Sequence, residues 1–160
     1  MHKHHIGILC LFLATPVSAL DSVGTVTAKL EGQDLTWQVL RQEGGSAMVQ
    51  VTDIGPISMI DLSAFGDGNF YVGLVYEGSP AIEKAPAGIT IDLRPDKGPL
   101  AGTIWKSDAA PSAPEMSFDR LDLQDTGRME ASFTAVLCRN DDPAQCKTVT
   151  GRIDTDLAGR

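Results

Sequence analysis

Histidine is nearly absent from this sequence, and that absence narrows the chemistry open to the chain. All three histidines, His2, His4 and His5, lie within the first five residues. Histidine is the usual proton carrier near neutral pH, and it completes Ser-His-Asp and Cys-His arrangements and many zinc sites. The sequence also lacks G-x-S-x-G, S-x-x-K, H-E-x-x-H and glycine-rich phosphate-binding motifs. We therefore expect no catalytic residue, no metal ligand and no cofactor.

Cysteine is scarce as well, and only Cys10, Cys138 and Cys146 are present. Cys138 and Cys146 flank a polar loop between two stretches of alternating apolar and polar residues, the pattern of a β-hairpin. Facing cysteines on adjacent strands have the Cβ separation of about 3.5–4.5 Å that a disulfide needs. The alternatives are two free thiols or a metal site, but a zinc site here would need carboxylates among its ligands. We expect a Cys138–Cys146 disulfide, which requires an oxidising compartment.

Basic and aromatic residues are few. The chain has 13 Lys and Arg against 21 Asp and Glu, and 6% of its residues are aromatic. An acidic surface repels phosphate groups, and no basic stripe with interleaved aromatics is present. The aromatic girdles of an outer-membrane barrel are missing too. The composition predicts neither a nucleic-acid partner nor membrane insertion of the mature chain; its partner, a protein or a small molecule, is not identified.

The apolar run at residues 6–14 is too short to cross a bilayer, which takes about 20 such residues. Lys3 precedes the run, Pro16 follows it, and the small residues before position 20 suit signal peptidase. The pattern predicts a secretory signal peptide over residues 1–19, removed after Ala19.

The presence of Cys10 raises the alternative of a lipoprotein, but Leu9 stands where a small residue is expected. Without residues 1–19 the chain has 12 basic residues (13 less Lys3) against 21 acidic ones, a formal charge of 12 − 21 = −9. We expect residues 20–160 to form a single all-β domain in the periplasm or outside the cell.

The clearest structural pattern lies in residues 128–157. Placing Cys138 opposite Cys146 sets large residues against small ones at almost every rung: Ala135–Val149, Phe133–Gly151, Ala131–Ile153 and Met129–Thr155. Phe133 across Gly151 is the arrangement in which an aromatic ring covers a strand glycine. The pattern predicts this register, with Phe133 facing the core.

The rest of the sequence reads as short strands. About ten of them are separated by turn signals every 8–12 residues, and no amphipathic helix is evident. A slip in the alternation near Asp119-Arg120 indicates a bulge. We expect an antiparallel β-sandwich, with a small closed β-barrel as the alternative.

Two acidic segments give weak metal signals. Asp67-Gly68-Asn69 begins like a calcium loop but does not meet the EF-hand spacing, so it is better interpreted as a hairpin turn. Asn140-Asp141-Asp142 clusters acceptor oxygens, and we interpret it as a solvated loop tip.

Four aromatic residues could line a ligand groove, because amphipathic rings favour such places: Trp37, Tyr71, Tyr76 and Trp105. Trp37 shares its parity with Leu35 and Val39, which predicts a core position. Trp105 stands beside a loop, and we expect it at the surface.

Two segments resemble the ends of small uncharacterised secreted β-proteins of Gram-negative bacteria. The early V-T-A-K-L-E-G…T-W and the late A-S-F-T-A-V-L-C…C-K-T-V-T-G-R-I-D are similar to patterns of approximately TAxLDGxxxxW and GxFxAxLC…VxGxFD. The match covers residues 25–37 and 131–154, with Ala131 where such proteins often have Gly and Ile153 where they have Phe. The resemblance implies a β-fold and an envelope location, and it brings no catalytic residues.

These observations favour a non-catalytic periplasmic binding or structural module. One alternative is a hydrolase that uses a carboxylate pair on an envelope glycan, since 21 acidic residues always supply some pair. Another is a lipocalin-like carrier of a small apolar ligand. A carrier needs a cavity, whereas the small–large pairing of the last hairpin indicates a filled core, and the G-x-W element of such carriers is missing before Trp37.

Overall fold

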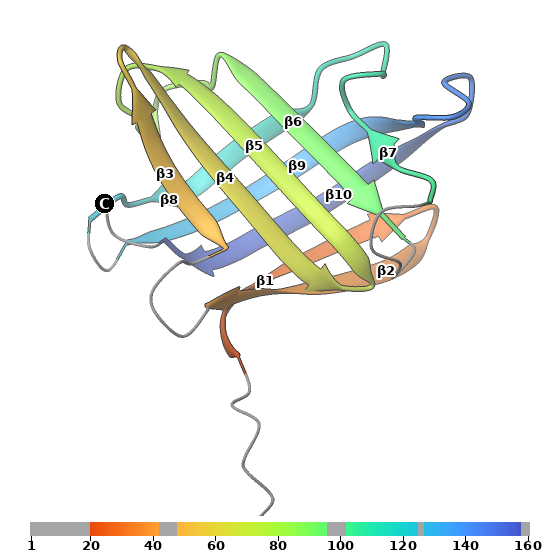
Figure 1. Cartoon of the computed structure of the whole chain (residues 1–160), viewed down its shortest axis with the longest axis horizontal. Helices are drawn as coiled ribbons and strands as arrows, with labels where there is room; N and C mark the ends of the chain where they lie inside the picture. The colour runs from red at the N-terminus through yellow and green to blue at the C-terminus, as the bar shows by residue number, and fades with distance from the viewer. Residues whose placement is uncertain (1–19, 42–47, 96–101, 125–126, 158–160) are drawn as a thin grey trace, which may run out of the picture.

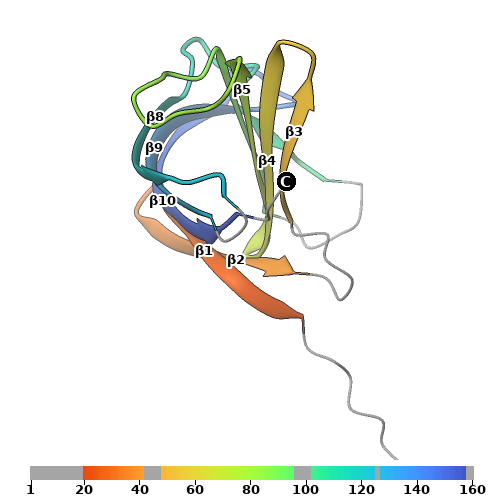
Figure 2. The ribbon, with the colours of Figure 1, turned by 90° about the vertical axis from the view of Figure 1, so that its left-hand side faces the viewer.

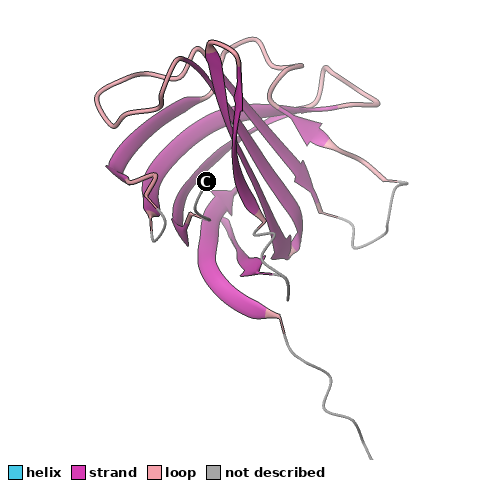
Figure 3. Ribbon diagram, turned by 60° about the vertical axis from the view of Figure 1, so that its left-hand side comes forward, coloured by secondary structure: helices cyan, strands magenta, loops and turns pink. Residues whose placement is uncertain are grey.

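The structure, a computed structural model, describes residues 20–41, 48–95, 102–124 and 127–157. The regular structure of these residues is entirely β-strand (Figure 3). The strands are β1 (Asp21–Leu30), β2 (Gln33–Arg41), β3 (Val49–Ile54), β4 (Ile57–Gly66), β5 (Gly68–Glu77), β6 (Gly88–Arg94), β7 (Trp105–Lys106), β8 (Glu115–Leu121), β9 (Arg128–Arg139) and β10 (Cys146–Asp156). The all-β prediction is confirmed.

Eight of these strands close an antiparallel barrel, in the order β1-β2-β4-β5-β6-β7-β9-β10 with β10 returning to β1. The other two are additions, since β3 pairs with β4 and β8 pairs with β9. Of the two architectures that the sequence left open, the structure therefore has the closed barrel, and the preferred sandwich is not the one that forms.

The barrel has two walls that cross each other. The front wall consists of β3, β4, β5 and β6, and the back wall consists of β8, β9, β10, β1 and β2 (Figure 1). Seen from the side, the walls curve toward each other and enclose the core (Figure 2). They join at two corners, each made by ladders of only two rungs: β2 with β4, and β6 through β7 to β9. These short ladders, rather than strand count, distinguish this barrel from a sandwich.

Gly66 explains how the first corner closes. It ends β4 and pairs with Trp37 of β2, and a Cβ atom there would overlap the Thr36 carbonyl oxygen. The next residue secures the contact, because the Asp67 carboxylate accepts a hydrogen bond from the Thr36 N–H at 2.9 Å and its carbonyl accepts one from Trp37 Nε1 at 3.0 Å. The motif at residues 67–69 is therefore a hairpin turn, as predicted, and this turn also fastens the front wall to β2.

The C-terminal hairpin has the predicted register. Cys138 pairs with Cys146, and Phe133 lies opposite Gly151 with only 3% of its surface exposed. A Cβ atom on Gly151 would meet the Phe133 ring and lie 2.5 Å from the Thr27 carbonyl oxygen. The slip predicted near Asp119 is also confirmed, as a register shift between Phe118 and Arg120 in the β8–β9 ladder.

The inward-facing side chains form one hydrophobic cluster that draws on both walls. Three aromatic rings cross it in succession: Trp37 lies 5.1 Å from Phe70, and Phe70 lies 5.5 Å from Phe133, measured between ring centroids. Trp37 is fully buried, so its predicted core position is confirmed. The rings thus bridge β2, β5 and β9 across the barrel.

Candidate binding site on the outer face of the barrel

On the outer face of the front wall, aromatic, charged and polar side chains lie next to one another in rows that run across the strands. One row, defined by the strand registers, runs Ser63–Tyr71–Asp92–Lys106 across β4, β5, β6 and β7, and the next runs Phe65–Asn69–Arg94. Between these rows lies a hollow of about 270 Å³, lined at its outer face by Ser63, Phe65, Asn69, Tyr71, Asp92 and Arg94. We call it the front hollow. It combines two aromatic rings with a carboxylate, an amide, a hydroxyl and a guanidinium group.

Tyr71 forms one side of the front hollow, and its position depends on a glycine. A Cβ atom on Gly73 would lie 2.6 Å from the Tyr71 hydroxyl, so the ring can extend along β5 only because residue 73 has no side chain. The hydroxyl donates a hydrogen bond to Asp61 Oδ1 at 2.5 Å. Burial, this hydrogen bond and the charges of Asp61 and Asp92 raise the pKa of Tyr71 to about 12. The ring is therefore held in place and its hydroxyl stays protonated at neutral pH.

Asp92 is the least satisfied group of the front hollow. Its Oδ1 atom is buried and has no hydrogen-bond partner among the described residues. Burial raises the pKa of this carboxyl group above its ordinary value, although the positive charges of Lys106 and Arg94 act in the opposite direction. A buried acceptor without a partner costs about 1–3 kcal/mol, so the fold holds Asp92 beside the hollow at some cost to its stability.

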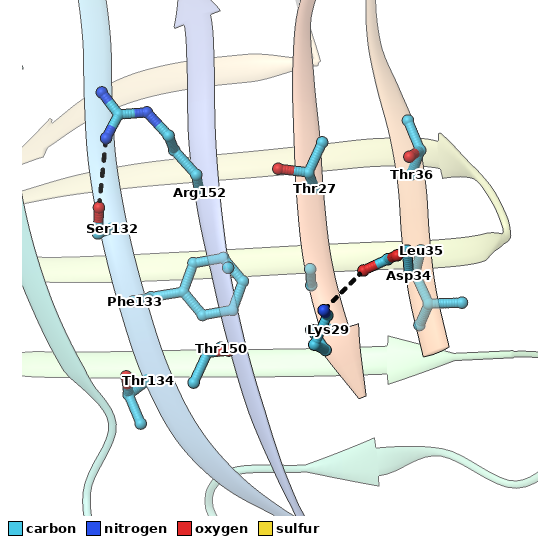
Figure 4. A pocket seen from close by; sticks show the side chains of 12 residues that line it. Thr27, Lys29, Asp34, Leu35, Thr36, Ser132, Phe133, Thr134, Thr150 and Arg152 are labelled. Atoms are coloured by element: carbon cyan, nitrogen blue, oxygen red, sulfur yellow. Dashed lines mark hydrogen bonds and ion pairs between the residues drawn. The ribbon is translucent and has the colours of Figure 1, made fainter. Parts of the chain in front are cut away.

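A second hollow lies on the back wall, and Figure 4 shows it from close by. It is wider and more open, with a volume of about 570 Å³. Its polar surface consists mainly of hydroxyl groups, including those of Thr27, Thr36, Ser132 and Thr150.

The charged groups of this second hollow already have partners. Lys29 lies 3.5 Å from the Asp34 carboxylate, and Arg152 lies 2.9 Å from Asp119 and 3.8 Å from Glu130. Threonine is also a common residue of exposed strands because its branched side chain suits the pleated surface. The back-wall hollow is therefore explained by strand structure alone, and the front hollow is the better candidate site.

The structure brings the predicted cysteine pair together. The sulfur atoms of Cys138 and Cys146 lie 2.01 Å apart, the distance of a disulfide. Cys138 is buried where β7 pairs beside it, whereas Cys146 is exposed. The adjoining loop is an ordered tip, in which Arg139 pairs with Asp141 at 2.7 Å and Gln145 Nε2 donates to Asp142 at 2.7 Å.

The other aromatic candidates divide between the core and the surface. Tyr76 faces the barrel interior and Tyr71 the front hollow. The expectation for Trp105 is wrong, because this residue is only 8% exposed. The ammonium group of Lys147 lies 4.8 Å above its ring, and β7 forms part of the barrel corner. Lys147, which is distant in the sequence, thus covers Trp105. The loop next to Trp105 had suggested an exposed position.

The sequence pattern did not reveal a site at Phe65, Asn69, Asp92 and Arg94, which line the front hollow, or at Asp61, which holds the Tyr71 hydroxyl. One signal was available. Residues 57–65 read as a strand that is apolar on both faces, yet Asp61 interrupts them, and the next strand carries a glycine at residue 73. A carboxylate and a glycine within otherwise apolar strands indicate a special position on a sheet.

Two further predictions from the sequence concern processing and membranes, and they do not depend on the front hollow. The predicted signal peptide and its cleavage point at residues 1–19 lie outside the described residues. Within the residues that the structure describes, no helix has the length and apolar character needed to span a membrane.

The fold and site together define a closed eight-stranded antiparallel barrel with a mixed aromatic and polar hollow on its outer face. No family model matches the chain, and no curated protein or solved structure is significantly similar to it. The resemblance of its two hairpins to secreted β-proteins therefore stays a prediction.

Proposed function

We propose that this chain is an exported, non-catalytic binding module of the periplasm that holds its ligand in the front hollow. The observation that carries the proposal is the combination of Tyr71 and Asp92. The Tyr71 ring is held over Gly73, next to a carboxylate whose buried oxygen has no partner among the described residues. Ligand sites are typically apolar hollows with a few convergent polar groups and perturbed pKa values.

Binding accounts for the front hollow better than catalysis does. A glycosidase needs two carboxyl groups that flank the bond to be cleaved. Asp92 lines the front hollow, whereas Asp61, on β4 with β5 between the two, does not line it. Asp61 is also engaged by Tyr71. With no histidine after residue 5, the chain offers little else for proton transfer.

The barrel fold agrees with a lipocalin-like carrier, but side chains occupy the interior of this barrel where a ligand would lie. An eight-stranded barrel is just wide enough to be filled by side chains or to hold one small ligand. Here the rings of Trp37, Phe70 and Phe133 follow one another across the interior. A ligand inside would have to displace at least one ring, so we favour the outer face.

Location in an oxidising compartment is supported by the cysteine pair at disulfide distance. Intact mass of the exported protein, with and without reductant and alkylation, tests this part of the proposal. We expect a chain that begins at Leu20 and takes up no alkylating reagent before reduction. A retained N-terminal segment or two reactive thiols would contradict export or oxidation respectively.

The binding function is tested by titrating isotope-labelled protein with a small-molecule fraction and a polymer fraction of periplasmic extract. We expect at least one fraction to shift the backbone amide signals of β4, β5 and β6. The Arg94→Ala variant should lose the shifts, whereas Thr150→Val, on the back wall, should retain them. If neither fraction moves the front-wall signals, or if both variants behave alike, the proposal is wrong.

A further inference from the structure

We infer that the front hollow binds a single sugar ring of a glycan, an inference that rests on the proposed function and names its ligand class. The geometry that points to a sugar is the alternation of apolar and polar groups around one small hollow. Phe65, which is 39% exposed, and Tyr71 provide ring surfaces. Asp92, Asn69 and Arg94 stand beside them in the same two rows. A sugar ring has the matching character, with C–H groups on its faces and hydroxyl groups on its edge.

The hydrogen-bonding groups select a ligand that both donates and accepts. Asp92 in its ionised form only accepts, Arg94 only donates, and Asn69 and Ser63 do both. Adjacent hydroxyl groups can donate to the carboxylate and accept from the guanidinium at the same time. Asp92 lines the hollow, so a ligand hydroxyl can donate to the part of its carboxylate that faces the hollow.

The charges argue against ionic ligands. Charges of both signs surround the front hollow: the acidic groups are those of Asp61, Asp92 and Asp108, and the basic groups are those of Arg94 and Lys106. A phosphate group is an anion, and it would be repelled by the Asp92 carboxylate and by the chain's net negative charge. A cation would meet Arg94 and Lys106. A neutral hydroxylated ligand avoids both penalties.

The size of the front hollow sets how much of a glycan it holds. Its volume of about 270 Å³ lies below the range of roughly 300–1,000 Å³ that is typical of sites for drug-sized ligands. One ring fits, and the rest of an oligosaccharide would extend over the open sheet. We therefore expect weak binding to a single unit of a longer chain.

The test uses five probes on the full, isotope-labelled protein: chitohexaose, maltohexaose, soluble glycan strands released from peptidoglycan, inorganic phosphate and lauric acid. We expect at least one of the three glycan probes to shift the amide signals of β4, β5 and β6, with no such effect of phosphate or lauric acid. Asp92→Ala should weaken that binding roughly tenfold or more, because it removes a hydrogen bond to a charged group. Ser132→Ala, on the back wall, should leave it unchanged.

A stability measurement separates a binding role of Asp92 from a structural one. Since its carboxylate is incompletely satisfied in the fold, Asp92→Ala should unfold at the same denaturant concentration as the parent protein or a higher one, while its glycan affinity falls. If affinity and stability fell together, Asp92 would be a structural residue and the inference would fail.

The remaining outcomes distinguish this inference from the function on which it rests. Front-wall shifts with lauric acid, phosphate or an extract fraction, but with no glycan probe, would overturn the sugar assignment and leave the binding function standing. Glycan shifts confined to the back wall would overturn the choice of hollow. Absence of front-wall shifts with every probe and every extract fraction would overturn both.

Discussion

Gly151 on the back wall and Gly73 on the front wall each lie beneath an aromatic ring, but on opposite faces of the barrel. Phe133 covers Gly151 from the inside, where its ring also packs 5.5 Å from Phe70. Tyr71 covers Gly73 from the outside, where its hydroxyl reaches Asp61. An aromatic ring over a strand glycine therefore fills the core on the back wall and forms one side of the surface hollow on the front wall.

The two walls also differ in how completely their charges are paired. On the back wall, Arg128 lies 2.8 Å from Asp156 and 3.3 Å from Glu130. On the front wall, Asp92 keeps a buried oxygen without a partner among the described residues. Natural proteins tolerate such a deficit mainly where it serves a function, because a site that is fully satisfied without its ligand has little to gain from binding. Tyr76 and Asp154 also carry such an oxygen, but of these three residues only Asp92 lines the front hollow. We therefore assign the proposed site to the front wall and no such role to the back wall.

Removing the ring inside the barrel should have the largest effect. We expect Phe133→Ala to lower the free energy of unfolding by about 3–5 kcal/mol, as truncations of buried aromatic residues do. Ser132→Ala, the neighbouring residue on the outer face, should change it by less than about 0.5 kcal/mol. Urea denaturation of the two variants measures both values. Equal losses would mean that the inward and outward faces of β9 are assigned wrongly.

Opening the cysteine pair should have the next largest effect and should be confined to the back wall. The two cysteines are separated by 8 positions, and closing a loop of that length stabilises by about 2.6 kcal/mol in the chain-entropy model. A Cys138→Ala/Cys146→Ala double variant should lose up to this amount in urea denaturation. Its β4, β5 and β6 amide signals should keep their positions. Movement of those signals would show that the two walls are coupled.

Adding a methyl group to each glycine tests the comparison directly. Gly151→Ala should cost about 1–3 kcal/mol, because the new atom meets a packed ring and the Thr27 backbone. Gly73→Ala should change stability by less than about 0.5 kcal/mol, because only the end of the half-buried Tyr71 side chain stands in the way. The displaced ring should nevertheless weaken ligand binding at the front hollow. The reverse order of stabilities would contradict the roles assigned to the two walls.

The smallest effect concerns tyrosine ionisation at high pH. Burial raises the pKa of Tyr76 to about 12, compared with about 10 in the unfolded chain. In this range the unfolded state has lost the proton and the folded state retains it, so stability falls as pH rises from about 10 toward 12. Tyr76→Phe should reduce this alkaline loss.

The same variant should differ little from the parent protein at neutral pH, because the Tyr76 hydroxyl has no hydrogen-bond partner among the described residues. Tyr71 also has a raised pKa, so Tyr71→Phe should reduce part of the remaining alkaline loss. Urea denaturation near neutral pH and near pH 11 measures both effects. An alkaline loss of the same size in the parent protein and in both variants would show that other groups cause it.

The sequence by itself determined the features that depend on strands adjacent in the chain. Alternation places Phe133, Leu137 and Val149 inside, and matching large residues to small ones sets the β9–β10 register and brings Cys138 to Cys146. These features are predictable because a period of two residues and direct cross-strand pairing are local rules, and a slip of one residue would turn every side chain to the wrong face.

Only the tertiary structure decided between the sandwich and the barrel. The choice depends on two-rung ladders between strands that are not consecutive, such as Trp37 with Gly66 and Trp105 with Arg139. No alternation pattern specifies which distant strand a short segment meets. The same reason explains the burial of Trp105, which is covered by Lys147 of a strand far along the chain.

The front hollow likewise depends on distant segments. Asp61, Tyr71 and Asp92 come from three strands, and each one by itself reads as an ordinary outward-facing residue. Their chemistry arises when the registers of β4, β5 and β6 place them side by side and Gly73 leaves room for the Tyr71 ring. A pattern of apolar and polar residues shows which face a side chain occupies, but the neighbours it meets on that face, and hence its burial and pKa, are set by how the strands assemble.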